Sequence, residues 1–394
     1  MRRLRIGVLF GGRSTEHEVS ILSAQSIIAA MDPDRFEAVP LYIDKSGRWL
    51  FGGSLKRLIS DDAARQYVYL PPDPTQHSLV HARNGTESPS PLVGVGGASP
   101  SPLVGEGRGG GLPELDVIFP VFHGLNGEDG TIQGVLELAN IPYVGAGVLG
   151  SALGLDKVYM KRAFAAVGLP IVDYIAITRR RYEEDPDAFI KLVEERIGYP
   201  CFSKFANSGS SVGTTKAHDR AELAAGLRLA ATFDRKILVE RAVDARELEV
   251  SVLGNDEPKA SVVGEVVPAH EFYDYEAKYL DEGSRLLIPA PIDAGVADKV
   301  RAMAIEAFQA VDAAGMARVD FFLERTSGRI VLNELNTIPG FTRISMYPKL
   351  WEASGLAYPK LIERLVELAI ERFNDKQRSQ TAIDSRLLDP GAGE

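Results

Sequence analysis

The segment 315–347 constrains the fold most, because it predicts a β-hairpin followed by a glycine-containing loop. Two apolar runs, 319–323 and 330–332, flank a Thr-Ser-Gly turn at 326–328. Both runs carry apolar residues at odd and even positions, which indicates a sheet that is covered on both faces. Charges in such a sheet are rarely tolerated unless they are paired.

Four polar side chains are predicted to share one face of this hairpin. A turn centred in the Thr-Ser-Gly sequence pairs Asp320 with Glu334 and Arg318 with Asn336, and directly paired residues project from the same face. Two carboxylates and an amide are oxygen ligands that suit Mg²⁺, which also takes phosphate oxygens and water. Arg318 would face an anion. The alternative is a solvent-exposed hairpin with ordinary surface charges.

Length and charge limit the classes of protein that fit. The 394 residues are enough for two or three domains, and the net charge of −10 argues against a nucleic-acid or membrane-surface binder. Cys201 is the only cysteine, and its apolar neighbours favour a buried structural thiol in a reducing compartment. The start lacks a signal-peptide pattern, and apolar segments are too short to span a bilayer. We therefore expect a cytoplasmic protein without membrane insertion or a nucleic-acid partner.

The N-terminal part predicts a doubly wound α/β domain. Residues 4–10 form an apolar strand that ends in a Gly-Gly turn, and a capping box at 15–18 precedes a helix. Further strands are predicted at 39–44 and 116–122. Ligands of such sheets bind at the carboxyl ends of the strands, where Glu16 would lie. Glu16 could equally be a first-turn charge that favours the helix dipole.

Two segments are predicted to lie outside the folded units. Residues 84–111 are rich in Gly, Ser and Pro and contain the sequence SPSPLVG twice. Because this composition cannot bury enough apolar surface to offset the loss of chain entropy, we expect a disordered insertion in a surface loop. Residues 376–394 are expected to be a loose polar tail.

Glycine-rich turns occur at two positions before the middle of the chain. His123 lies in the first, at 122–130, and a lone histidine in a turn is more often structural. The second, at 145–150, matches the G-x-G-x-x-G pattern of dinucleotide sites. That pattern requires the first strand of a βαβ unit before it, whereas here it comes late in the first domain. A nicotinamide site is therefore the less favoured interpretation.

Two later loops fit a nucleotide site with a lid, although the first, taken without Lys157 and the carboxylate hairpin, fits a linker equally well. The loop 207–213 consists mostly of small residues, and its backbone N–H groups could fold over phosphates beside Lys204. No Gly-Lys-Ser/Thr follows, so the loop is not a P-loop. Residues 272–279 combine three tyrosines and a phenylalanine with charges, which indicates a compact lid that covers a binding site.

Several of these segments resemble the D-alanine–D-alanine ligase family of the ATP-grasp superfamily. They are ARVDFFL at 317–323, LNELNTIPGFT at 332–342, SMYP at 345–348, the turn HGLNGEDG at 123–130 and the octet FYDYEAKY at 272–279. The resemblance covers nearly the whole chain except the insertion and the tail.

The resemblance implies an α/β fold, α+β in part, with the three-domain ATP-grasp architecture. The expected units are an N-terminal domain at 1–145, a central subdomain at 146–240 and a C-terminal subdomain at 241–375, which holds the metal site and a lid loop at 270–284. It also implies ATP-dependent joining of two D-alanines through an acyl phosphate, for peptidoglycan precursors. Mg²⁺ or Mn²⁺, with two ions bound, ATP as a substrate and a homodimer are implied as well.

The resemblance also implies site residues. For the D-alanine substrates and the chemical steps these are Glu16, His123, Ser210, Tyr279, Arg318, Gly340 and Ser345. For ATP they are Lys157, Lys204, Glu240, Arg241, Val243, Glu247 and Lys278. For the metal they are Asp320, Glu334 and Asn336.

Three other functions stay open at this point. Another ATP-grasp carboxylate–amine ligase would share the metal hairpin and the lysines but need not share Glu16 or the tyrosine-rich lid. A nicotinamide enzyme would use no ATP. A non-catalytic nucleotide-binding regulator would keep Lys157 and Glu240 and could lose Arg318.

Overall fold

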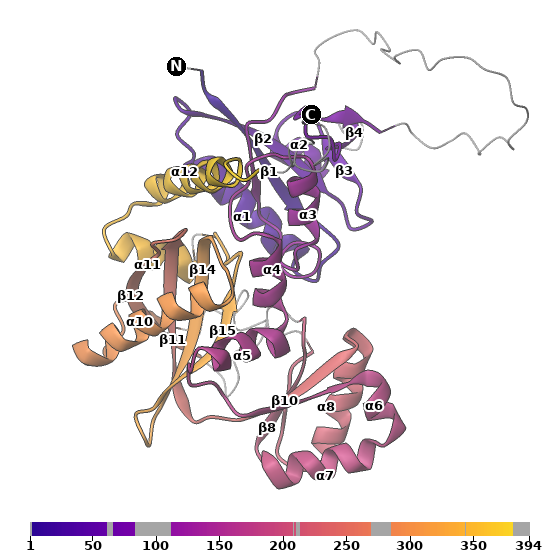
Figure 1. The fold of residues 1–394 in the computed structure, drawn as a ribbon, viewed down its shortest axis with the longest axis vertical. Coiled ribbons are helices and arrows are strands. Elements are labelled where there is room, and N and C mark those ends of the chain that lie inside the picture. The colour runs from indigo at the N-terminus through magenta and orange to yellow at the C-terminus, as the bar shows by residue number, and fades with distance from the viewer. Residues whose placement is uncertain are drawn as a thin grey trace, which may run out of the picture.

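The computed structural model describes residues 2–60, 66–82, 112–207, 209, 213–268, 285–342 and 344–380. In this part of the chain, three β-sheets follow one another along the sequence. Figure 1 has the N-terminal sheet at the top, the C-terminal sheet below it and the central sheet at the bottom. The predicted insertion at 84–111 and the lid at 270–284 lie outside the described residues, as do residues 381–394 of the tail.

The N-terminal sheet has a parallel centre and an antiparallel extension, in the order β5-β4-β3-β2-β1-β6. The parallel strands are β1 (Leu4–Gly11), β2 (Phe36–Ile43) and β6 (Val117–Pro120). The sequence prediction missed the antiparallel strands β3 (Trp49–Phe51), β4 (Gln66–Tyr69) and β5 (Val80–His81). Each has four residues or fewer, which is too short for a recognisable alternation.

Helices cover both faces of this sheet, as expected of a doubly wound domain. Because side chains alternate along β1, Ile6 packs with α1 (His17–Ala30), whereas Leu9 packs with α3 (Thr131–Leu138). The short helix α2 (Leu55–Ser60) lies beside β2.

The predicted capping box at the start of α1 is wrong. Glu16 is the N-cap residue, and no side chain caps this described helix. Glu18, the expected capping partner, instead pairs with Lys45 at 2.6 Å. The hydroxyl of Ser14 accepts the backbone N–H of Glu16 at 3.1 Å, so a residue before the predicted box orders this turn.

The central sheet is antiparallel, in the order β7-β10-β8-β9. Its strands are β7 (Tyr174–Thr178), β8 (Cys201–Phe205), β9 (Thr215–Ala217) and β10 (Lys236–Arg241). The helices of this region are α4 (Val148–Leu155), α5 (Lys157–Ala166), α6 (Arg179–Glu184), α7 (Pro186–Arg196) and α8 (Arg220–Phe233). Cys201 is fully buried, as predicted, and burial raises the pKa of its thiol to about 11.

The C-terminal sheet is also antiparallel, in the order β13-β12-β11-β14-β15. Its strands are β11 (Ala245–Gly254), β12 (Lys259–Val267), β13 (Arg285–Leu287), β14 (Gly315–Glu324) and β15 (Ile330–Asn336). One face packs against α5 and α10 (Ala294–Ala310), and α11 (Met346–Ala353) lies against β11 and β12.

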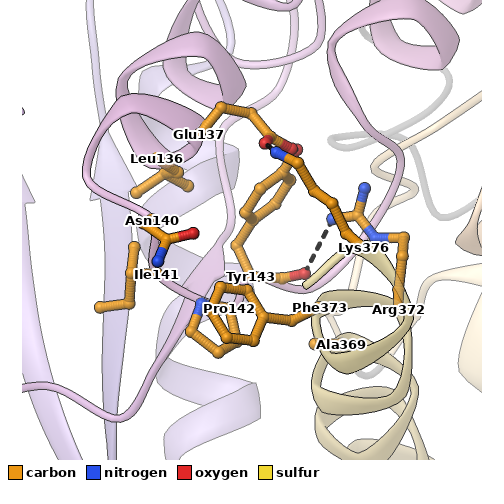
Figure 2. A pocket seen from close by; sticks show the side chains of 10 residues that line it. All are labelled: Leu136, Glu137, Asn140, Ile141, Pro142, Tyr143, Ala369, Arg372, Phe373 and Lys376. Atoms are coloured by element: carbon orange, nitrogen blue, oxygen red, sulfur yellow. Dashed lines mark hydrogen bonds and ion pairs between the residues drawn. The ribbon is translucent and has the colours of Figure 1, made fainter. Parts of the chain in front are cut away.

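The last helix, α12 (Tyr358–Lys376), joins the C-terminal segment to the N-terminal sheet. Its apolar side chains, among them Leu361 and Leu365, belong to one core with Ile6 and Phe119. At its end, Arg372 donates to the carbonyl of Tyr143 at 3.2 Å and lies 4.3 Å from the centroid of the Tyr143 ring (Figure 2). In the described chain, no helix combines the length and apolarity needed to cross a membrane.

Candidate active site

The hairpin β14–β15 carries the core of the candidate site. Asp320 pairs with Glu334 and Arg318 with Asn336, which confirms the predicted pairing. The register between this pair and the turn differs from the predicted one, because Phe321 pairs with Leu332 and Asn333 is skipped. Asn333 is thus an extra residue, a β-bulge, and it brings Glu334 opposite Asp320.

Arg318 joins the carboxylates of two neighbouring strands. Its guanidinium donates two hydrogen bonds of 2.7 Å to Asp320 and lies 3.1 Å from a carboxylate oxygen of Glu249 on β11. The amide of Asn336 also donates to Asp320, at 3.2 Å. Burial lowers the pKa of Arg318, but the attraction of Asp320 and Glu249 raises it more, so the group stays charged. Sequence reasoning missed Glu249, which could have been found as the residue two positions after Glu247 on the same strand.

The helix α5 brings Lys157 to the same face. The Lys157 ammonium lies 2.9 Å from the Glu334 carboxylate. Asp156 caps the helix by accepting the backbone N–H groups of Val158 and Tyr159, and the Lys157 N–H donates to the carbonyl of Ala206 at 3.0 Å. The sequence therefore fixes Lys157 between the central and C-terminal sheets through a strong N-cap.

A second cluster of buried charges lies beside the first. The Glu240 carboxylate is 2.6 Å from the ammonium of Lys204 and 2.9 Å from that of Lys161, and Glu240 is only 2% exposed. Burial alone would raise the pKa of Glu240, but the two ammonium groups lower it to about 2. Sequence reasoning missed Lys161. It stands four residues after Lys157 on a predicted helix, hence on the same face, and that spacing is the available signal.

Only some of the other predicted nucleotide-binding residues lie near these two clusters. Glu247 lies on β11, opposite Phe322 of β14, and Val243 lies in the connection between β10 and β11. The side chain of Arg241 is half exposed and pairs with Asp173 at 2.7 Å, so it lies apart from the buried clusters. Lys278 lies outside the described residues.

The N-terminal domain contributes a glycine-rich turn that holds the loop after β15. His123 forms a hydrogen bond of 3.0 Å from Nδ1 to the Ile338 carbonyl, and Glu128 accepts the Ile338 N–H at 2.9 Å. Both side chains are buried. Burial lowers the pKa of His123, whereas burial and the charge of nearby Glu16 raise the pKa of Glu128 to about 8. Glu128 belongs to the turn noted in the sequence, but its contact across the domains was not foreseen.

Glu16 lies close to Gly209, which follows β8 of the central sheet. Glu16 is buried, and a Cβ atom placed on Gly209 would collide with its carboxylate. Gly340 is similarly close to Ser345, because an added Cβ would lie 2.8 Å from the Ser345 hydroxyl oxygen. That hydroxyl in turn accepts the N–H of Thr342 at 3.1 Å. The predicted residues Ser210 and Tyr279 lie outside the described part of the chain.

Two family models match this chain. Residues 5–146 match the D-ala D-ala ligase N-terminus, and residues 163–367 match the D-ala D-ala ligase C-terminus. The chain belongs to the D-alanine–D-alanine ligase family. The family, the fold class and the ligase class predicted from the sequence are confirmed.

Relatives in this family match along their full lengths. The D-alanine–D-alanine ligase of Heliobacterium modesticaldum is 50% identical over 389 residues, which is 98% of this chain and 100% of the relative. That of Thermoanaerobacter sp. is 48% identical and covers 96% of this chain and 99% of its own length. The family assignment therefore concerns the whole chain.

Solved structures of family members have the same fold. The D-alanine–D-alanine ligase from Coxiella burnetii has a TM-score of 0.79 and 32% identity, with 96% of this chain and 97% of that chain covered. The VanG D-Ala:D-Ser ligase from Enterococcus faecalis has a TM-score of 0.78 and 32% identity, with 93% and 100% covered.

The ligase hairpin offers a donor set that fits a hard cation. Asp320 and Glu334 lie at paired positions of two strands, and the Asn336 amide lies next to Asp320, so the hairpin brings carboxylate and amide groups together. Among the residues that the structure describes, no three His, Cys, Asp or Glu side chains form a metal cluster. The hairpin set, with two carboxylates and an amide, is of the incomplete kind that phosphate oxygens and water fill for Mg²⁺.

Proposed function

We propose that this chain uses ATP to join two D-alanine molecules into D-alanyl-D-alanine. The observation that carries the proposal is the meeting of three groups at one place. The Asp320–Glu334 hairpin lies against Lys157, the lysine pair on Glu240 adjoins it, and the glycine-rich turn beside Glu16 holds the loop after β15. A full-length relative that is 50% identical is named D-alanine–D-alanine ligase.

The chemistry requires activation of a carboxylate. A carboxylate oxygen of the first D-alanine attacks the γ-phosphorus of ATP, ADP leaves, and an acyl phosphate forms. The amine of the second D-alanine then attacks the acyl carbon, the C–O bond to phosphate breaks, and the amine loses a proton as the peptide bond forms. Because charge is spread over the moving phosphoryl group, neutralising that charge is the main task of the site.

The proposed nucleotide site uses the buried lysines. Lys157 and Lys204 contact the phosphates, with Lys278 from the lid, and the side chain of Glu240 and the backbone of Val243 recognise adenine in an apolar slot. Glu247 binds the ribose hydroxyls, and Arg241 flanks this slot at the end of β10. Mg²⁺ or Mn²⁺, with two ions bound, would be held by Asp320, Glu334 and Asn336 and would neutralise phosphate charge.

The proposed D-alanine sites lie between the N-terminal turn and the loop after β15. Glu16 holds the ammonium of the first D-alanine, with Ser210 and Tyr279 as its partners, and His123 supports this arrangement. Arg318 and the Gly340 N–H stabilise the oxyanion that develops during amine attack. Ser345 contacts the carboxylate of the second D-alanine.

We further propose the wider setting implied by the family. The units are 1–145, 146–240 and 241–375, and the lid at 270–284 excludes water that would hydrolyse the acyl phosphate. The protein works in the cytoplasm as a homodimer, and its product enters peptidoglycan precursors.

The test is phosphate release from ATP with Mg²⁺ and single amino acids. We expect phosphate release with D-alanine alone. When L-alanine, D-serine or D-lactate is added to a low concentration of D-alanine, we expect it to increase the release much less than added D-alanine does. D-serine is included because the VanG relative is a D-Ala:D-Ser ligase at 32% identity. ATP hydrolysis that ignores D-alanine would contradict the proposal.

A further inference from the structure

Lys161 is a buried lysine to which the proposed reaction assigns no task. Its side chain is 1% exposed, and its ammonium contacts the Glu240 carboxylate at 2.9 Å. It also donates to the backbone carbonyl of Asn333 at 3.1 Å and lies 5.9 Å from the centroid of the Tyr174 ring. Burying an ammonium group costs free energy unless the group is paired and hydrogen-bonded, so the contacts of Lys161 with Glu240 and Asn333 are needed to offset that cost.

The Asn333 contact places Lys161 at the bulge of the metal strand. Asn333 is the residue that the hairpin register skips, and the next residue is Glu334. On the other side of Glu334, the Leu335 N–H donates to the sulfur of Met160 at 3.3 Å. Consecutive residues of α5 thus hold the backbone on both sides of Glu334.

The Glu240 contact ties the same lysine to the proposed adenine side. Glu240 keeps a second cation, Lys204, at 2.6 Å. Removal of the Lys161 charge would therefore leave Glu240 paired, whereas the Asn333 carbonyl would lose the donor that Lys161 supplies. The expected consequence lies at the bulge rather than at the carboxylate.

We propose that Lys161 is a positioning residue that fixes the β15 bulge, and with it the Glu334 carboxylate, relative to Glu240. It couples the nucleotide side of the site to the metal side through one ammonium group. The proposal deepens the proposed function and rests on it for the role of Glu334. A substitution should weaken divalent-ion binding in the nucleotide complex and leave D-alanine binding nearly unchanged.

The decisive measurement is Mn²⁺ binding to the full chain in the presence of ADP, followed by electron paramagnetic resonance without turnover. Lys161→Met removes the donor with little change of volume. Lys191→Met is the matched control, because Lys191 is a helical lysine whose side chain is 73% exposed. We expect Lys161→Met to weaken Mn²⁺ binding about tenfold, which is about 1.4 kcal/mol, and Lys191→Met to leave it unchanged.

Steady-state kinetics and a third variant complete the test. In Lys161→Met, the Mg²⁺ concentration for half-maximal activity should rise about tenfold, while the KM for D-alanine changes less than about twofold. Lys161→Arg keeps a charged donor and should recover most of the Mn²⁺ affinity. If Lys161→Met does not fold, Lys161→Gln replaces it. The glutamine side chain is neutral and shorter, so it cannot reach both the Glu240 carboxylate and the Asn333 carbonyl.

Equal Mn²⁺ affinity in Lys161→Met, or in Lys161→Gln if that variant is used, and Lys191→Met would overturn the inference. A rise in the KM for D-alanine as large as the loss of Mn²⁺ affinity would also overturn it, because general loosening of the site would then explain both. Failure of the wild-type chain to release phosphate with D-alanine would refute the proposed function instead, while the Mn²⁺ comparison would still report on Lys161.

Discussion

At the scale of the residue, the site consists of charges that satisfy one another. Asp320 is held by Arg318 and Asn336, and Glu334 by Lys157. Such pairing orients both carboxylates without requiring them for the hydrophobic core. Their substitution should therefore affect the chemistry far more than the fold.

Asp320→Asn and Glu334→Gln should each lower turnover by at least about a hundredfold, because the site loses a negative oxygen donor for the metal. Far-ultraviolet circular dichroism should be unchanged, and ADP formation with D-alanine is the assay. Phosphate release near the wild-type rate by either variant would refute the metal assignment.

Glu128 predicts a pH dependence of stability. Its pKa is raised from the ordinary value of 4.5 to about 8, so between these values the folded state binds a proton that the unfolded state releases. The stabilisation is complete below pH 4.5 and is lost as the pH rises through about 8. Glu128→Gln lacks this titration.

Urea unfolding of the wild type and of Glu128→Gln across this pH range measures the effect. The difference in unfolding free energy, wild type minus variant, should fall as the pH rises toward 8. A difference that rises with pH would show that the pKa of Glu128 is lowered in the folded state, which would contradict the prediction.

At the scale of the element, the sequence predicted what local pattern determines. The turn and the two apolar runs predicted the hairpin and the pairing of Asp320 with Glu334, although the structure reaches that pairing through a bulge. The apolar periodicity predicted most helices and longer strands. The partners Lys161, Glu249 and Glu128 were missed because their contacts join segments far apart in the chain. The bulge at Asn333 was missed because its support from α5 is also tertiary.

Gly209→Ala tests how closely the central loop approaches the N-terminal domain. An added Cβ would meet the Glu16 carboxylate, so we expect the KM for D-alanine to rise about tenfold or more, with a smaller change in the KM for ATP. Gly295→Ala in α10 is the control, because its Cβ would meet no atom within 4 Å. Equal kinetics of the two variants would contradict the contact.

At the scale of the whole molecule, α12 ties the end of the described chain to the N-terminal sheet. Its apolar face shares a core with β1 and α1. Its last turns add the Arg372 contacts with Tyr143 and an ion pair between Lys376 and Glu137 (Figure 2). Because α1, whose N-cap residue is Glu16, packs in this core, α12 also helps to hold Glu16 in place.

Arg372→Ala should destabilise the protein by about 1–2 kcal/mol, since it removes a hydrogen bond and a cation–π contact. Lys376→Ala should cost less than about 0.5 kcal/mol, because its ion pair is half exposed. Urea unfolding measures both, and a larger effect of Lys376→Ala would contradict this view of the α12 contact.

The central claim is that ATP activates a D-alanine carboxylate before the peptide bond forms. D-alanine labelled with ¹⁸O in its carboxylate, incubated with ATP, Mg²⁺ and the protein, tests it through the mass of the phosphate released. The account predicts that each phosphate carries one labelled oxygen, because the bond that breaks lies between the acyl carbon and that oxygen. Unlabelled phosphate formed together with dipeptide would contradict it.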